Sequence, residues 1–210
     1  MTNARLFGAL LVVALGARIG AAQEARLLAI RDDATRDRVR LFVEAAQRRG
    51  TPAEPLIARA LEGVAFKADA KRIEKAMAAL EKRLRRAHEL LGRNASVDEI
   101  SAAADALANE VPDDAIRELR RIAPQRTITV ELGVLTELVL KGVAPKTAAR
   151  MVRDLMARGA TGTQLTELNA VVQQDVALGV SPIEALNVRG RGVMSLLPPP
   201  AGTVLAQPRP

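Results

Sequence analysis

The feature that most constrains the fold is a junction that occurs twice in the second half of the chain. It reads Gly142-Val143-Ala144-Pro145 and, 37 residues later, Gly179-Val180-Ser181-Pro182. Glycine suits the left-handed residue just past a helix end, where the valine can complete a Schellman motif. Proline suits the first helical position, whose N–H has no partner within the helix. Each junction therefore predicts a helix, a sharp stop and an immediate restart.

Similar signals predict helices along most of the chain. The longest predicted helix spans 66–91, where apolar residues at a 4, 3, 4, 3, 4 spacing form one seam: Ile73, Met77, Leu80, Leu84, Ala87 and Leu91. Capping boxes predict helix starts at Thr51, Ser96, Thr161 and Ser181. Predicted helix ends fall at Gly50, Gly63, Gly92, Gly159 and Gly190. We interpret residues 128–130, which alternate briefly like a strand, as the lead-in to a helix.

These elements predict an all-α fold of consecutive short helical hairpins joined by Gly/Pro turns. The repeat is degenerate, because the 92 residues from Gly50 to Gly142 are not a multiple of 37. Two architectures stay open, an irregular α-solenoid and a compact helical bundle, each with the longer helix near 66–91 as its spine.

The two ends of the chain differ from the middle. Arg5, the apolar run 6–16 and the small residues Gly20-Ala21-Ala22 have the pattern of a cleaved signal peptide over 1–22. The apolar run is too short to span a bilayer, so we expect no transmembrane span in the mature form. The alternative is a retained anchor or a buried first helix. We predict one all-helical domain over 23–190 and a disordered, proline-rich tail over 191–210.

Composition argues against several classes of function. Apolar residues make up 49% of the chain, enough for a core, but aromatics make up 1%, with no Trp or Tyr. Nucleic-acid platforms and sugar clefts depend on aromatic stacking. The absence of Cys and the single His leave no thiol nucleophile and no thiolate or His-rich metal site. Glu167 and Asp175, eight residues apart on one predicted helix, are too distant for a glycosidase pair. We therefore predict no enzyme, no cofactor, no metal and no nucleic-acid partner.

Two stretches resemble a loosely described set of bacterial exported all-helical proteins of unknown function. They are QRRGTPAEPLIARALEG (Gln47–Gly63) and KGVAPKTAARMVRDLMARGA (Lys141–Ala160). The resemblance implies export and a helical fold. It implies no activity and no site residue.

The formal charge of +7 makes the basic residues candidates for contact with an anionic partner. The densest group lies on the longest predicted helix, and a second group precedes the tail; together they are Lys82, Arg83, Arg85, Arg86, Arg189 and Arg191. We interpret the helix group first as a solvated face, with Glu81 pairing with Arg85 at i, i+4. We interpret the second as a helix stop with favourable cations. The alternative for both is a contact with an anionic polymer or lipid.

Together these features predict an exported, periplasmic or secreted, non-catalytic interaction or scaffold protein of the bacterial cell envelope. Its partner would be an unknown envelope protein. The alternative is an electrostatic binder of anionic envelope polymer or lipid through the basic helix face. A third hypothesis, a hydrolase that uses a lone carboxylate, would need a deep pocket around one buried acid.

Overall fold

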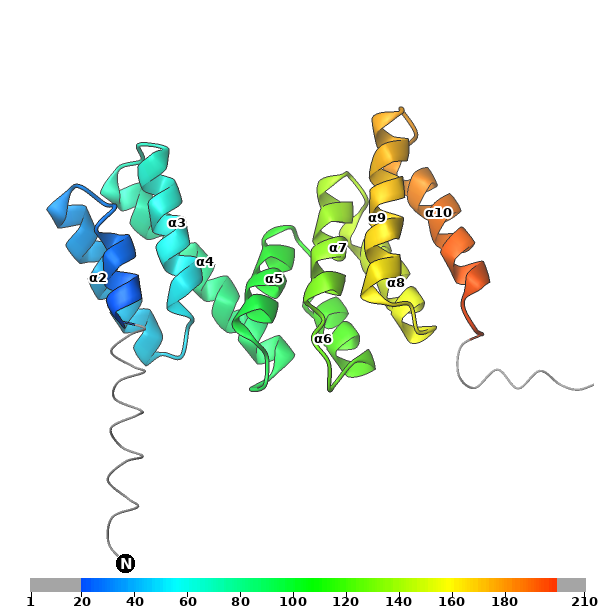
Figure 1. Ribbon diagram of the computed structural model, residues 1–210, viewed down its shortest axis with the longest axis horizontal. Helices are drawn as coiled ribbons and strands as arrows, with labels where there is room; N and C mark the ends of the chain where they lie inside the picture. Colours follow the sequence, from blue (N-terminus) through cyan, green and yellow to red (C-terminus); the bar gives the residue numbers. More distant parts are fainter. Residues whose placement is uncertain (1–19, 200–210) are drawn as a thin grey trace, which may run out of the picture. The chain divides into compact units, whose positions relative to one another are not determined.

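The computed structural model describes residues 20–199, which form helices and turns and contain no strand (Figure 1). The all-α prediction is confirmed. The sequence predicted one domain over 23–190, whereas the chain divides into two compact units. The boundary between them in the sequence lies between Lys82 and Arg83, within α4 (Ala70–Leu91). Each unit buries its own apolar side chains, such as Ile57 and Met77 in unit 1 and Leu135 and Leu155 in unit 2. Within 20–199, none of the helices combines the length and apolar character that a bilayer span requires.

Unit 1 holds a helical segment at 20–27, α2 (Asp33–Arg48), α3 (Ala53–Ala65) and α4 (Ala70–Leu91) as far as Lys82. The apolar faces of its helices form its core, and α2 packs against α3. Val39, Leu56, Ile57 and Met77 are at most 1% exposed. The predicted long helix begins at Ala70 rather than at Phe66, because residues 66–69 form the turn out of α3.

The described part of unit 2, residues 83–199, contains the rest of α4 and six further helices. They are α5 (Val97–Ala108), α6 (Asp113–Ile122), α7 (Thr129–Leu140), α8 (Pro145–Ala157), α9 (Gly162–Ala177) and α10 (Pro182–Leu196). α7 packs against α5 and α9, while α8 packs against α6 and α10 (Figure 1). Alternate helices therefore form two rows, which are joined by the hairpins α7–α8 and α9–α10. This is the predicted series of helical hairpins.

Both Gly-Val-Xaa-Pro junctions have the predicted geometry. Gly142 and Gly179 have φ angles of 97° and 95°. The N–H of Val143 donates to the carbonyl of Leu138 at 3.1 Å, and the N–H of Val180 donates to that of Asp175 at 3.0 Å, which are the long-range bonds of Schellman motifs. Pro145 and Pro182 begin α8 and α10. The two turns also lie side by side, since a Cβ on Gly142 would be 3.4 Å from Cγ of Pro182.

Two helices close in the same way without glycine. Lys67 after α3 and Glu110 after α5 have φ angles of 54° and 62°. The long-range bonds are present, from the N–H of Ala68 to the carbonyl of Gly63 at 2.9 Å and from the N–H of Val111 to that of Ala106 at 3.1 Å. The predicted stop at Gly63 is therefore wrong, because α3 continues past it to Ala65.

The predicted stop at Gly190 is also wrong. α10 runs through Gly190, Arg191 and Gly192 to Leu196, so residues 191–196 are helical rather than part of a disordered tail. The reason is packing: Gly190 is buried, and a Cβ there would lie 2.6 Å from Sδ of Met151 on α8. Residues 197–199 of the predicted tail follow the helix without regular structure. Residues 200–210 of the tail and residues 1–19 of the predicted signal peptide lie outside the described residues.

The predicted helix caps divide into three kinds. Ser96 with Glu99, and Thr161 with Gln164, form complete capping boxes, as predicted. Ser181 accepts a hydrogen bond from the N–H of Glu184 at 3.3 Å. The box at Thr51 is wrong, because Pro52 is the N-cap of α3 and no side chain caps it. The hydroxyl of Thr51 is buried without a hydrogen-bond partner.

Candidate functional site

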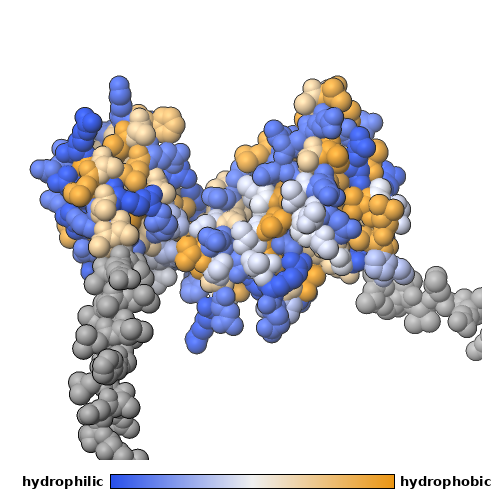
Figure 2. All heavy atoms as spheres, viewed as in Figure 1, coloured by the Kyte–Doolittle hydropathy of each residue, from blue (hydrophilic) through white to orange (hydrophobic). Residues whose placement is uncertain are grey.

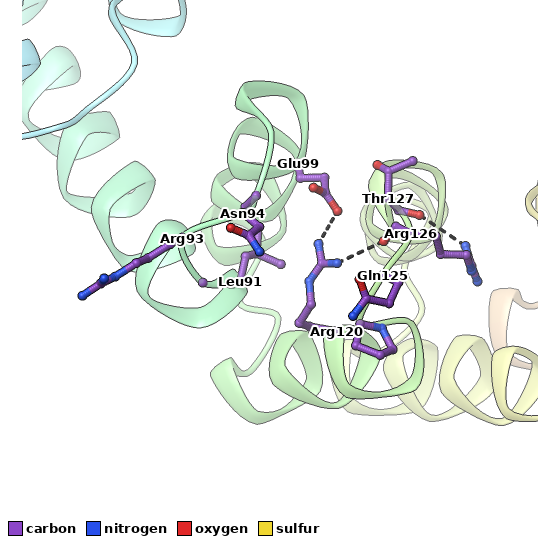
Figure 3. Close-up of a pocket in the computed structure, with 11 residues that line it drawn as sticks. Leu91, Arg93, Asn94, Glu99, Arg120, Gln125, Arg126 and Thr127 are labelled. Carbon is purple, nitrogen blue, oxygen red and sulfur yellow. Dashed lines mark hydrogen bonds and ion pairs between the residues drawn. The ribbon is translucent and has the colours of Figure 1, made fainter.

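A polar hollow of about 270 Å³ lies at one end of unit 2 (Figure 3). Its walls come from the end of α4 and the following turn, the start of α5, and the segment that links α6 to α7. It is lined by Leu91, Gly92, Arg93, Asn94, Ala95, Glu99, Arg120, Pro124, Gln125, Arg126 and Thr127.

Local sequence signals place the walls of this hollow. Gly92, with a φ of 89°, ends α4, and Ser96 caps α5 four residues later. The capping box places Glu99 in the first turn of α5, where its Oε2 accepts the N–H of Ser96 at 3.1 Å. A carboxylate in the first turn also interacts favourably with the helix dipole.

Glu99 is the centre of a buried network. It is 4% exposed, and its Oε1 accepts the N–H of Ile128 at 2.9 Å as well as a hydrogen bond from the guanidinium of Arg120 (Figure 3). Burial raises the pKa of Glu99, but the hydrogen bonds from Ile128, Ser96 and Arg120 outweigh it, so the pKa lies below its usual value. One ionised carboxylate therefore connects the start of α5 with α6 and with the start of α7.

Arg120 completes the floor of the hollow. Its NH1 donates to the carbonyls of Ala123 at 3.2 Å and Arg126 at 3.0 Å. Arg126 in turn pairs with Glu131, which is 1% exposed, and donates to the carbonyl of Thr127 at 3.2 Å. The guanidinium groups of Arg120 and Arg126 are thus engaged by the protein itself.

The remaining polar groups of the hollow include two side-chain amides. The Arg93 side chain points away from the hollow (Figure 3). The carboxamides of Asn94 and Gln125 line it, and neither has a side-chain hydrogen bond to another described residue. Glu99 is a poor general base, because three donors hold its carboxylate and its pKa is low. The hollow can offer amide donors and acceptors to a polar ligand.

Of the six basic residues predicted to contact an anionic partner, two form ion pairs within the protein. Arg86 pairs with Asp113 and, at 2.7 Å, with Glu89. Arg189 donates to both carboxylate oxygens of Asp175 at 2.7 and 2.8 Å. Lys82, Arg85 and Arg191 are exposed, and Arg83 is half-buried.

The predicted pair between Glu81 and Arg85 is wrong. Glu81 is 9% exposed and pairs with Arg49, whose NH2 lies 2.8 Å from its Oε1. Glu81 lies on the buried side of α4, whereas Arg85 is exposed. Spacing along one helix could not show this, because the partner is 32 residues away in the chain.

Sequence reasoning missed the polar networks that join helices. Glu99 and Glu131 were not predicted as site residues. The capping box at Ser96 was the one local signal for Glu99, because Glu99 is its third helical residue. The polar pair Asn169 and Gln173, four residues apart on α9, was missed as well. Asn169 is 5% exposed, and both amides on α9 donate to the carboxylate of Glu137 on α7, from Gln173 at 3.0 Å.

Comparisons with protein-family models, with curated proteins and with solved structures found no match. Residues 20–199 contain no group of three or more side chains that could hold a metal ion.

Proposed function

We propose that this chain is an exported, non-catalytic interaction module of the bacterial cell envelope that binds an envelope protein through unit 2. The observation that carries the proposal is the exposed end of the two-row helix stack. Apolar residues at the turns α7–α8 and α9–α10 are 36–77% exposed: Leu140, Leu178, Val180 and Ile183. Figure 2 shows hydrophobic residues gathered at the upper end of unit 2. Such groupings on a stable domain are typical of protein-binding surfaces.

The proximity of the two junctions supports this surface. Since Gly142 lies against Pro182, the exposed side chains on either side belong to one region rather than to two isolated turns. The backbone of each turn is restricted by a glycine with a positive φ, at 142 or 179, and by a proline, at 145 or 182. Little conformational entropy would therefore be lost on binding.

The carboxylates support a role without catalysis. Glu81, Glu99 and Glu131 are the buried acids of the described residues, and each is paired with an arginine. A catalytic acid or base requires a free proton site with a pKa near the working pH. Export rests on the sequence pattern of residues 1–22 and on the resemblance to exported helical proteins.

The test is a crosslinking pull-down from native envelopes with the chain expressed in full and tagged at its C-terminus. The mass of the recovered protein reports whether the N-terminus has been removed. We expect a protein partner that survives high salt and is lost in Leu178→Asp. The matched control is Leu41→Asp, an equally simple change at an exposed leucine of unit 1. Equal recovery with both variants, or no protein partner, would contradict the proposal.

The alternative, an electrostatic binder acting through Lys82, Arg83, Arg85, Arg86, Arg189 and Arg191, receives less support. Arg86 and Arg189 are neutralised by acidic neighbours. The high-salt arm of the pull-down tests this alternative, because salt screens such contacts. Recovery of only polymer or lipid, lost at high salt, would favour it.

A further inference from the structure

The turn between α3 and α4 in unit 1 exposes the side chain of Phe66. Phe66 is 80% exposed, whereas Phe42, the other aromatic residue that the structure describes, is half-buried. Two hollows adjoin this turn, of about 410 and 360 Å³, and Lys67, Ala68 and Ile73 line both. Phe66 itself lines the larger hollow, and a large apolar ring exposed to solvent gains free energy when a partner removes it from water.

Lys67 follows Phe66 in a conformation that side chains rarely adopt. Its φ of 54° is the left-handed value that the other closing turns assign to Gly50, Gly142, Gly159 and Gly179. Glycine would satisfy the backbone at lower cost, so a lysine at this position costs conformational energy. Lys67 and Phe66 line the same hollow of about 410 Å³.

Further cations surround the turn without acidic partners. Arg31, Lys67, Lys71 and Arg72 are exposed and form no ion pair with any described residue. The nearby acids are engaged: Asp69 accepts the N–H of Arg72 at 2.8 Å, Asp32 accepts that of Thr35 at 2.8 Å, and Glu62 pairs with Arg59 at 2.8 Å. The N–H hydrogen bonds leave the Asp69 and Asp32 carboxylates charged, but Lys67, Lys71 and Arg72 outnumber Asp69. Residues 66–72 therefore combine a protruding aromatic ring with a net charge of +2.

We propose that residues 66–72, with Arg31 beside them, form a docking surface for an anionic lipid bilayer. Phe66 enters the boundary between headgroups and acyl chains, and Lys67, Lys71 and Arg72 contact lipid phosphates. An aromatic anchor surrounded by long basic side chains matches the layered polarity of a membrane surface, because the apolar stems lie among the acyl chains and the charges reach the headgroups. The inference does not depend on the function proposed above, because it concerns a different unit and is tested with purified protein.

The first test uses the absence of tryptophan from the chain. Phe66→Trp places one fluorophore at the docking surface. We expect its emission to shift to shorter wavelength with vesicles that contain phosphatidylglycerol, and to stay unchanged with pure phosphatidylcholine vesicles. The matched control is Leu178→Trp, at a 77% exposed leucine of unit 2, which we expect to report no shift. Both variants share the same N-terminal residues, so binding through that region is common to both.

The second test removes charge in the Phe66→Trp background. Each basic residue near an anionic surface contributes about fivefold to partitioning. Lys67→Gln with Arg72→Gln should therefore weaken the vesicle response about 25-fold. The control pair Lys82→Gln with Arg85→Gln, on the basic face predicted from the sequence, should leave it unchanged. Circular dichroism checks that all variants remain helical.

Several outcomes would overturn the proposal. These are the absence of a shift at Phe66→Trp, an equal shift at Leu178→Trp, or a loss caused equally by both charge pairs. A shift that occurs only with envelope proteins, and not with vesicles, would assign the surface to a protein partner instead.

Discussion

A Cβ on Gly63 of α3 would lie 2.8 Å from Cγ1 of Ile73 on α4. Ile73 is 2% exposed and branched at Cβ, so its side chain has little freedom to move away. The glycine therefore allows the two helices to approach closely, and it does not end α3.

Gly63→Ala should destabilise the protein by about 1–2 kcal/mol. The added methyl group overpacks the contact with Ile73, and this cost exceeds the helix propensity gained by replacing glycine with alanine. The control is Gly192→Ala in α10, where no atom lies within 4 Å of the new Cβ. That variant should be stabilised by about 0.5–1 kcal/mol. Urea denaturation measures both, and a stabilised Gly63→Ala would contradict the packing argument.

Glu99→Gln should lower the free energy of unfolding by about 3 kcal/mol. The change removes the negative charge opposite Arg120, whose side chain is 18% exposed, and leaves that cation largely buried without compensation. The matched control is Glu89→Gln, because Glu89 pairs with Arg86 at the surface and its side chain is 64% exposed. The control should change stability by less than about 1 kcal/mol. Similar losses in the two variants would show that burial of Glu99 does not set the cost.

The low pKa of Glu99 gives stability a definite pH dependence. Because the folded-state pKa lies below its usual value of 4.5, the ionised carboxylate stabilises the fold above pH 4.5. That contribution should be lost as the pH falls from 4.5 through the folded-state pKa. Denaturation at a series of pH values should show a steeper loss for the wild type than for Glu99→Gln. Parallel pH profiles would exclude this contribution.

Thr51→Val should stabilise unit 1 by about 1 kcal/mol. Thr51 is 4% exposed and its hydroxyl has no hydrogen-bond partner, so an apolar group of the same shape removes a desolvation cost. Ser96→Ala, at a residue that does cap its helix, should instead lose about 1 kcal/mol. Thermal unfolding distinguishes the two. Destabilisation by Thr51→Val would mean that the hydroxyl has a partner in solution.

Glu110→Gly should stabilise the turn after α5 by about 1 kcal/mol, because it relieves a side chain held at a φ of 62°. Gly179→Ala makes the reverse change at a φ of 95°, where no atom would contact the new methyl group. The free energy of unfolding of Gly179→Ala should fall by about 1–2 kcal/mol, because alanine is strained at a positive φ. Denaturation of the pair should give shifts of opposite sign, and shifts of the same sign would contradict the prediction.

The helices and most of their turns could be predicted because their causes are local. Each of these features depends on residues within six positions of one another. They are the Schellman motifs at Gly142 and Gly179, the helix starts at Pro145 and Pro182, and the capping box at Ser96. The candidate hollow was not predicted, because its parts are far apart in the chain. Glu99 meets Ile128 across 29 residues and Arg120 across 21.

The sequence by itself determined the all-helical class, the order of the helices and the places where the backbone must turn, since periodicity, glycine conformation and proline geometry act within a few residues. Only the tertiary structure decided which glycines end helices and which allow close packing. Gly159 ends α8 at a φ of 85°, whereas Gly63 and Gly190 lie inside helices against Ile73 and Met151. It also decided which charges are paired, as Glu81 with Arg49 shows. The physical reason is that a neighbour's side chain, absent from the local sequence, sets the cost of a Cβ or of an unpaired charge.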